Sequence, residues 1–208
     1  MTEPMSAPAL AERIGAEIRQ LRERAGLSMR QLAAEAGISQ PFLSQIERGA
    51  SAPSMVTTYR LAEALRVLPG ALLPAPENTM VTVVRAADGR MLPVANRDDA
   101  ALGRALIMQS ASPLEVIEYL VEPHQHLAEW FQLEAELAVY LISGALDVEV
   151  EGVGVWRLGA RDLLAHPASL RHRWLLVDDQ PAHILLVLAH PSTSAGKAAT
   201  AGRFTAPT

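Results

Sequence analysis

The amino-acid sequence predicts an α + β protein of two domains, an all-α domain at the N-terminus and an all-β domain at the C-terminus. The chain has 208 residues, which exceeds a typical single domain of ~100–150 residues. Hydrophobic residues recur every three or four positions before residue 75, and they fall in short β-branched runs after residue 80. Proline and glycine cluster between the two parts. We therefore expect a helical domain at residues 8–74, a linker at 75–79, a β domain at 80–190 and a mobile tail at 191–208.

The composition is that of a soluble globular protein and excludes several other classes. Half of the residues are hydrophobic and 20% are charged, which is typical of a chain that forms folded cores. The longest purely apolar run, Ile184 to Ala189, is far shorter than the ~18–20 residues of a membrane span. The absence of cysteine excludes disulfides, thiolate metal sites and cysteine nucleophiles. No signal peptide is visible at the start, so we expect a cytoplasmic protein without membrane contact.

The charge is unevenly distributed between the two parts. The net charge is −5, but residues 1–75 hold eight arginines against seven glutamates and the rest of the chain is acidic. This slight basic excess does not by itself predict a nucleic-acid partner. Such a partner has to be argued from the geometry of particular residues.

Helix-capping residues divide the N-terminal part into five short helices. The first spans residues 11–24, where Ile14 and Ile18 lie on one face. Ser28 and Gln31 form a capping box at the start of the second. A final helical turn is expected at residues 71–73. The remaining boundaries come from the N-cap candidates Ser39 and Ser54 and from the helix-ending glycines Gly26, Gly37 and Gly49.

Short β-branched runs at roughly ten-residue spacing predict a sandwich or barrel after residue 80. No helical pattern of 10–15 residues lies between these runs, which argues against a parallel α/β sheet. In the run 136–142, Leu137, Val139 and Leu141 share one face, while Glu136 and Tyr140 face the other way. The expected strands cover residues 81–84, 114–121, 136–142, 145–150 and 184–188.

The second and third helices carry a recognisable motif. Its parts are Leu27-Ser28, Leu32-Ala33, Gly37-Ile38-Ser39-Gln40, Leu43-Ser44-Gln45-Ile46-Glu47-Arg48-Gly49 and Pro53-Ser54. These residues closely resemble the phage-repressor-like helix-turn-helix of the xenobiotic-response-element (XRE) type, over about residues 11–73. The resemblance implies sequence-specific binding to a double-stranded DNA operator.

The third helix is the expected recognition helix. Leu43 and Ile46 point inward, so the polar side chains near its N-terminus face outward, where the major groove is read. We expect base contacts from Gln40, Pro41, Ser44 and Gln45, and phosphate contacts from Arg30, Gln31, Ser39 and Arg48. The family often has glutamine after the first cap, where this chain has Met29. The alternatives are a helical bundle with a solvated polar face and a docking adaptor that does not touch DNA.

The C-terminal part resembles a cupin, a jelly-roll barrel. Residues 158–174, from Leu158-Gly159 to His172-Arg173-Trp174, look like the second cupin motif. Glu122-Pro123 and Val139 to Gly144 look like the first, and the likeness covers roughly residues 112–190. The order of the two domains resembles regulators that join a helix-turn-helix to a cupin sensor domain.

The cupin metal ligands are largely replaced in this chain. When the first motif is aligned from Gly144, the two histidine positions fall on Phe131 and Leu133, and the carboxylate position falls on Leu137; His172 alone matches. We therefore expect no metal, no cofactor and no enzymatic activity. In a rival register, His124, His126 and Glu129 join His172 in a metal site. That register would favour a metal-dependent cupin enzyme, epoxidase-like or dioxygenase-like, that carries a helix-turn-helix.

Without the metal, the barrel interior becomes a candidate pocket for a small-molecule effector. Apolar walls with a few polar groups are typical of small-ligand sites, although the same side chains could simply fill the barrel. We further expect a homodimer whose contacts involve the barrel strands. The predicted lining residues are Phe131, Leu133, Leu137, Val139, Leu141, His172 and Trp174. The leading hypothesis is a transcriptional regulator with a C-terminal effector and dimerisation domain.

Overall fold

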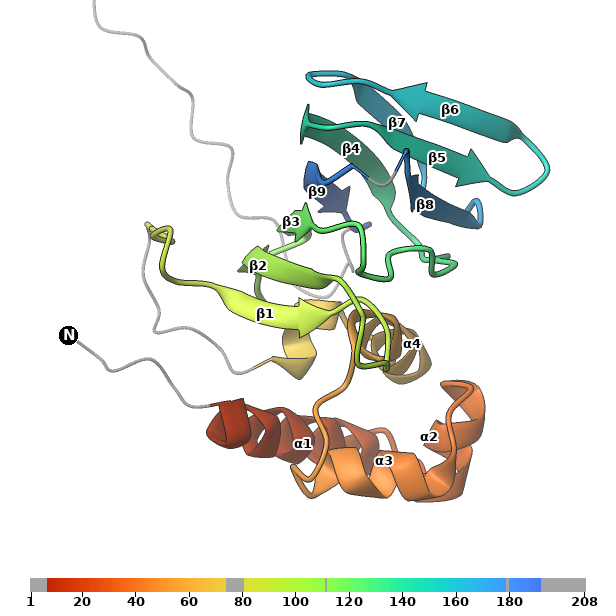
Figure 1. Ribbon diagram of the computed structural model, residues 1–208. Helices are drawn as coiled ribbons and strands as arrows, with labels where there is room; N and C mark the ends of the chain where they lie inside the picture. Colours follow the sequence, from red (N-terminus) through yellow and green to blue (C-terminus); the bar gives the residue numbers. More distant parts are fainter. Residues whose placement is uncertain (1–6, 74–80, 111, 179, 192–208) are drawn as a thin grey trace, which may run out of the picture.

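The computed structural model describes residues 7–73, 81–110, 112–178 and 180–191. The predicted linker at 75–79 and the predicted tail beyond Pro191 lie outside the described residues. Helices come first along the chain and strands follow, in the order that the sequence predicts (Figure 1). No helix in the described ranges is long and apolar enough to cross a membrane.

The N-terminal unit contains four α-helices, and the expected capping residues define their starts. Ser28 and Gln31 form the capping box of the second helix, and the side chains of Ser39 and Ser54 accept hydrogen bonds from the first turns of the third and fourth. The helices are α1 (Ala7–Arg24), α2 (Met29–Glu35), α3 (Gln40–Glu47) and α4 (Met55–Leu65). The expected count of five helices is not confirmed: four are α-helices, and the fifth element, η1 (Pro69–Leu72), is a single turn of 3-10 helix that overlaps the expected turn at 71–73.

Close contact between α1 and α3 depends on two glycines. A Cβ atom on Gly15 would lie 2.2 Å from the carbonyl oxygen of Ile46, and one on Gly49 would lie 2.7 Å from the Cα atom of Glu12. Because neither glycine has a side chain, the two helices approach closely enough to bury Ile14 and Ile46.

The C-terminal part is all β, with strands in two sheets. The larger sheet has the order β1-β2-β3-β9-β4-β7, and the smaller has the order β6-β5-β8. The rings of Tyr119 and Trp174, one from each sheet, meet edge to face with centroids 5.8 Å apart. The strands are β1 (Arg90–Pro93), β2 (Leu102–Met108), β3 (Leu114–Val121), β4 (Glu136–Ser143), β5 (Leu146–Val150), β6 (Gly154–Leu158), β7 (Leu163–Pro167), β8 (His172–Leu176) and β9 (Ala182–Ala189).

One expected strand does not form. Residues 81–84 pair with no other strand, and Val81 and Val83 are 75% and 61% exposed. β-branched residues favour a strand only where a neighbour covers them, and none does so here. The alternation predicted in β4 is confirmed, since Leu137, Val139 and Leu141 are all buried.

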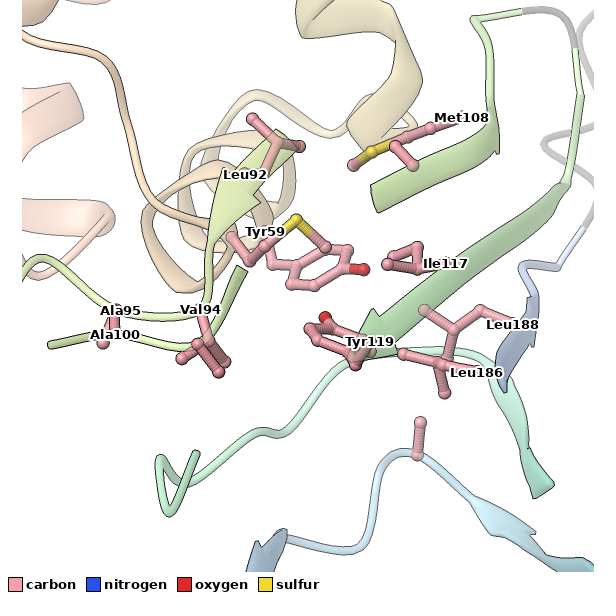
Figure 2. Packing of buried hydrophobic residues seen from close by; sticks show 14 of the residues in the cluster. Tyr59, Leu92, Val94, Ala95, Ala100, Met108, Ile117, Tyr119, Leu186 and Leu188 are labelled. Atoms are coloured by element: carbon pink, nitrogen blue, oxygen red, sulfur yellow. The ribbon is translucent and has the colours of Figure 1, made fainter. Parts of the chain in front are cut away.

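The helical unit and the sheets share one continuous hydrophobic core. Buried residues of α4, β1 and β3 belong to the same cluster, and Figure 2 shows Tyr59 of α4 among Leu92, Ile117 and Tyr119 of the strands. At η1, Gly70 lies against the backbone of Gln109, which a Cβ atom would approach to 2.4 Å. The two predicted domains therefore pack directly against each other.

Candidate functional site

The N-terminal half of α3 forms a polar surface. Leu43 and Ile46 are fully buried, and this fixes which face of the short helix points outward. Gln40, Pro41 and Gln45 are exposed, whereas Ser44 is partly buried. Three of the four predicted base-contacting side chains are thus open to solvent, and Ser44 is the least accessible.

The four predicted phosphate-contacting side chains also lie on the surface, and three of them take part in helix capping. The backbone N–H of Ser28 donates to Oε1 of Gln31 over 2.9 Å. Ser39 Oγ accepts from the N–H of Phe42 over 3.2 Å, and Nε of Arg48 donates to the carbonyl of Ser44 over 3.1 Å. All three residues keep donors that capping does not use: Gln31 keeps its amide NH2, Ser39 its hydroxyl hydrogen and Arg48 its terminal guanidinium N–H groups. Arg30 is exposed as well.

A buried ion pair fixes the orientation of α3. Nε and Nη2 of Arg22 donate to the two carboxylate oxygens of Glu47 over 2.7 and 2.9 Å, while Nη1 donates to the carbonyl of Leu27. The two side chains are only 11% and 3% exposed, and Glu47 raises the pKa of Arg22. Sequence reasoning missed this pair because the partners are 25 positions apart.

A small cavity lies between α4 and the two sheets. The cavity has a volume of about 20 Å³, which is room for about one water molecule. Of the predicted pocket residues, Phe131, Leu133, Leu137, His172 and Trp174 line this cavity.

The other two predicted pocket residues do not line this cavity. Val139 and Leu141 are instead fully buried core residues. Four lining residues were missed: Tyr59, Tyr119, Leu186 and Leu188. The period-two pattern of β3 and β9 could have suggested the last three, but no local signal places Tyr59 of α4 against the sheets.

His172 is the polar group expected in the pocket, and it is buried. Its Nδ1–H donates to the carbonyl of Leu170 over 2.9 Å, and its ring meets that of His166 edge to face, with centroids 4.7 Å apart. Burial lowers the pKa of His172 from 6.5 to about 4, because a desolvated imidazole is less easily charged. His172 is therefore neutral near pH 7.

This lowered pKa predicts a loss of stability in mild acid. Between pH 6.5 and 4 the unfolded chain protonates His172 while the folded protein does not, so the free energy of unfolding falls as the pH falls through this window. The decrease amounts to about 3 kcal/mol in total. Urea unfolding of the wild type and of His172→Asn at pH 4, 5, 6 and 7 measures it. The substitution leaves every other ionisable side chain in place, so the difference between the two proteins reports on His172 and should shrink with falling pH; parallel curves would contradict the assignment.

The rival metal site does not assemble in this structure. His126 contacts Glu129, with Nε2 and Oε1 2.9 Å apart, and His124 is exposed. In the described part of the chain, no three or more histidine, aspartate or glutamate side chains gather so that they could hold a metal ion. His172 instead joins Phe131 through paired backbone hydrogen bonds.

An unpredicted polar cluster lies at the junction of α4 and the large sheet. Glu115 is 1% exposed on the inner face of β3, and Oη of Tyr59 donates to its Oε2 over 3.1 Å. Nε2 of His190 lies 3.0 Å from Oε1 of Glu115, at an angle that does not make a hydrogen bond. Burial, followed by the charge of Glu115, raises the pKa of Tyr59, so its hydroxyl stays protonated.

Comparison with known proteins assigns the helical unit. Residues 13–75 match the family model of a helix-turn-helix domain, so this part of the chain is a helix-turn-helix domain. The search of the curated proteins found no match.

Solved structures resemble the chain at low sequence identity. A crystal structure of an HTH_3 family transcriptional regulator from Vibrio cholerae covers 90% of this chain and 100% of that one, with a TM-score of 0.68 and 21% identity. The two proteins therefore share a fold. Hydroxypropylphosphonic acid epoxidase from S. wedmorenis covers 86% and 98% at a TM-score of 0.41 and 14% identity. The restriction-modification controller protein C.AhdI from Aeromonas hydrophila covers 30% and 96% at a TM-score of 0.30 and 33% identity.

Proposed function

We propose that this protein is a sequence-specific DNA-binding transcriptional regulator of the XRE type. The observation that carries the proposal is the exposed polar surface of α3 within a matched helix-turn-helix domain. A recognition helix reads base edges with side chains near its N-terminus, and α3 exposes Gln40, Pro41 and Gln45 there. The shared fold with a transcriptional regulator agrees with this function.

The residues divide into two roles. Gln40 and Gln45 carry amides that can bond bidentately to adenine, and the ring of Pro41 suits contact with a thymine methyl group. Arg30, Gln31, Ser39 and Arg48 meet phosphates and set the register of the helix on the duplex. The buried pair of Arg22 and Glu47 holds α3 in place for both tasks.

The β domain acts as a cupin-like sensor and dimerisation domain. The cavity lining, mostly apolar with one neutral imidazole, has the chemistry typical of a small-molecule site. The helical domain is nearly neutral, so a single recognition helix should bind DNA weakly. A dimer that carries two recognition helices gains affinity from the second contact. A homodimer would therefore place two copies of α3 on one operator.

Selection from random duplex DNA with the full chain tests this function. We expect a two-fold symmetric site with half-sites ~34 Å apart, or a multiple of that spacing. On the selected site, Gln40→Ala should lose about 1–3 kcal/mol of discrimination per half-site against changed bases. Arg48→Ala should weaken binding to all sequences alike, because a phosphate contact carries no sequence information.

Glu63→Gln is the matched control, since Glu63 is an exposed residue of α4, away from α3. It should leave both affinity and discrimination unchanged. Enrichment of no sequence would refute the regulator function, and an asymmetric single site would refute the dimer. Unchanged discrimination in Gln40→Ala would show that α3 is wrongly assigned as the recognition helix.

A further inference from the structure

The cavity is too small for an organic effector in the described conformation. Its volume of about 20 Å³ holds about one water molecule, whereas a cavity of about 150 Å³ accommodates benzene. A ring-sized molecule therefore has to displace one wall. The wall that moves determines which helix or strand changes position when the ligand binds.

Most of the walls are held by backbone hydrogen bonds. Tyr119, Leu137, Leu186, Leu188, His172 and Trp174 belong to strands inside the two sheets. Phe131 and Leu133 lie between strands, but Phe131 exchanges backbone hydrogen bonds of 2.8 and 2.9 Å with His172, and Leu133 donates one of 3.0 Å to Ala168. Moving the backbone at any of these residues would break this pairing.

Tyr59 differs, because it comes from helix α4, and in the described residues one backbone hydrogen bond joins this helix to the β part, a long one of 3.4 Å from the N–H of Val56 to the carbonyl of Val94. Tyr59 itself is held by packing, by an edge-to-face contact with Phe131 at 6.4 Å between centroids, and by its hydroxyl bond to Glu115. Breaking that bond removes a hydrogen bond from a carboxylate that is 1% exposed, and Nε2 of His190, although 3.0 Å from Oε1 of Glu115, does not form one. The ligand has to offset this loss with its own binding free energy.

The lining chemistry defines the ligand. Among the described lining residues none carries a charge near neutral pH, and the carboxylate of Glu115 behind Tyr59 disfavours an anion. Four of the lining residues carry aromatic rings, namely Tyr59, Tyr119, Phe131 and Trp174. Nε1 of Trp174 is a buried donor without a partner, and such a group gains from an acceptor atom. These features fit a small, neutral, planar molecule that bears a hydrogen-bond acceptor.

We propose that Tyr59 is the movable wall of this cavity, and that a small neutral ring compound enters by breaking the Tyr59–Glu115 hydrogen bond and displacing helix α4. Because α4 packs on α2 inside the helix-turn-helix domain, its displacement shifts α3 relative to the sheets. That this shift of α3 changes the affinity for DNA rests on the proposed function. The movement itself can be measured without DNA.

The experiment places a ring in the cavity in two ways and measures amide hydrogen exchange of the full chain. Leu133→Phe adds the ring from a segment outside the strands, and phenol added to the wild type supplies a free neutral ring with an acceptor. Both should speed exchange in α4 about five-fold or more, while β3 and β9 stay unchanged. Glu134→Phe is the matched control, because it places the same ring on an exposed neighbouring residue, and it should change neither region.

On the DNA selected above, Leu133→Phe and phenol should also change affinity at least about five-fold, the lower end of typical allosteric coupling. Should Leu133→Phe fail to fold, phenol alone decides the question. Faster exchange in β3 or β9 with α4 unchanged would overturn the proposal, and so would no response to phenol up to its solubility. Faster exchange in α4 without any DNA binding would support the movable wall and refute the regulator function.

Discussion

Glu47→Ala is expected to lower the free energy of unfolding by about 3–5 kcal/mol, because it leaves the mostly buried guanidinium of Arg22 with only the exposed carboxylate of Glu23, 3.6 Å away, among its described acidic partners. Both side chains are nearly inaccessible, and two hydrogen bonds of 2.7 and 2.9 Å join them. The pair also connects α1 to the C-terminal end of α3. Affinity for DNA should therefore fall even at temperatures where the variant remains folded. Urea unfolding and DNA titration measure the two effects.

Two variants isolate the cause. Arg19→Ala removes the exposed pair of Arg19 and Glu23 without changing the partners of Arg22, and it should leave stability nearly unchanged, since solvent screens such pairs. The double change Arg22→Met with Glu47→Leu removes both charges and should recover most of the loss. A Glu47→Ala protein as stable as the wild type would show that Arg22 finds water or another partner.

Leu141→Ala is expected to cost about 2–5 kcal/mol of unfolding free energy, the range for leucine removed from a packed core. Leu141 is fully buried on β4, opposite Ile184 of β9. The sequence interpretation placed it in the ligand pocket, where truncation would enlarge a cavity at little cost in stability. The measured loss therefore distinguishes a core residue from a pocket residue.

Leu120→Ala serves as the comparison, because Leu120 is 64% exposed on β3 and its truncation should cost less than about 0.5 kcal/mol. Thermal or urea unfolding of both variants at pH 7 gives the contrast. If the two leucines cost the same, the inner face of β4 is not packed as described.

The helical part could be predicted from the sequence because its determinants are local. Ser28 and Gln31 lie three positions apart and cap the same helix, and Ser39 and Ser54 act in the same way. The solvent-facing side of α3 follows from two inward residues, Leu43 and Ile46. Such signals need no knowledge of the tertiary structure.

The β part was harder to predict because strands depend on distant partners. β2 was missed since Gly103 and Arg104 interrupt its apolar pattern, yet Gly103 is there because the ring of Tyr119 packs over it: a Cβ atom would approach that ring to 2.7 Å. The cavity was predicted in part, because its strand residues follow a period of two. Tyr59 and Glu115 lie 56 positions apart, and no sequence pattern within either segment predicts their contact.

The shared core bears on how such a protein can be rearranged by recombination. The helical unit buries Tyr59, Leu72 and Leu73 in the same cluster as Leu92 and Ile117 of the sheets. A chimera that joined residues 1–75 to a foreign β domain would expose these apolar side chains to water unless the new partner matched their shape. The two parts are therefore constrained to change together, and an exchange of β domains that preserves folding would have to keep the facing surfaces of β1 and β3.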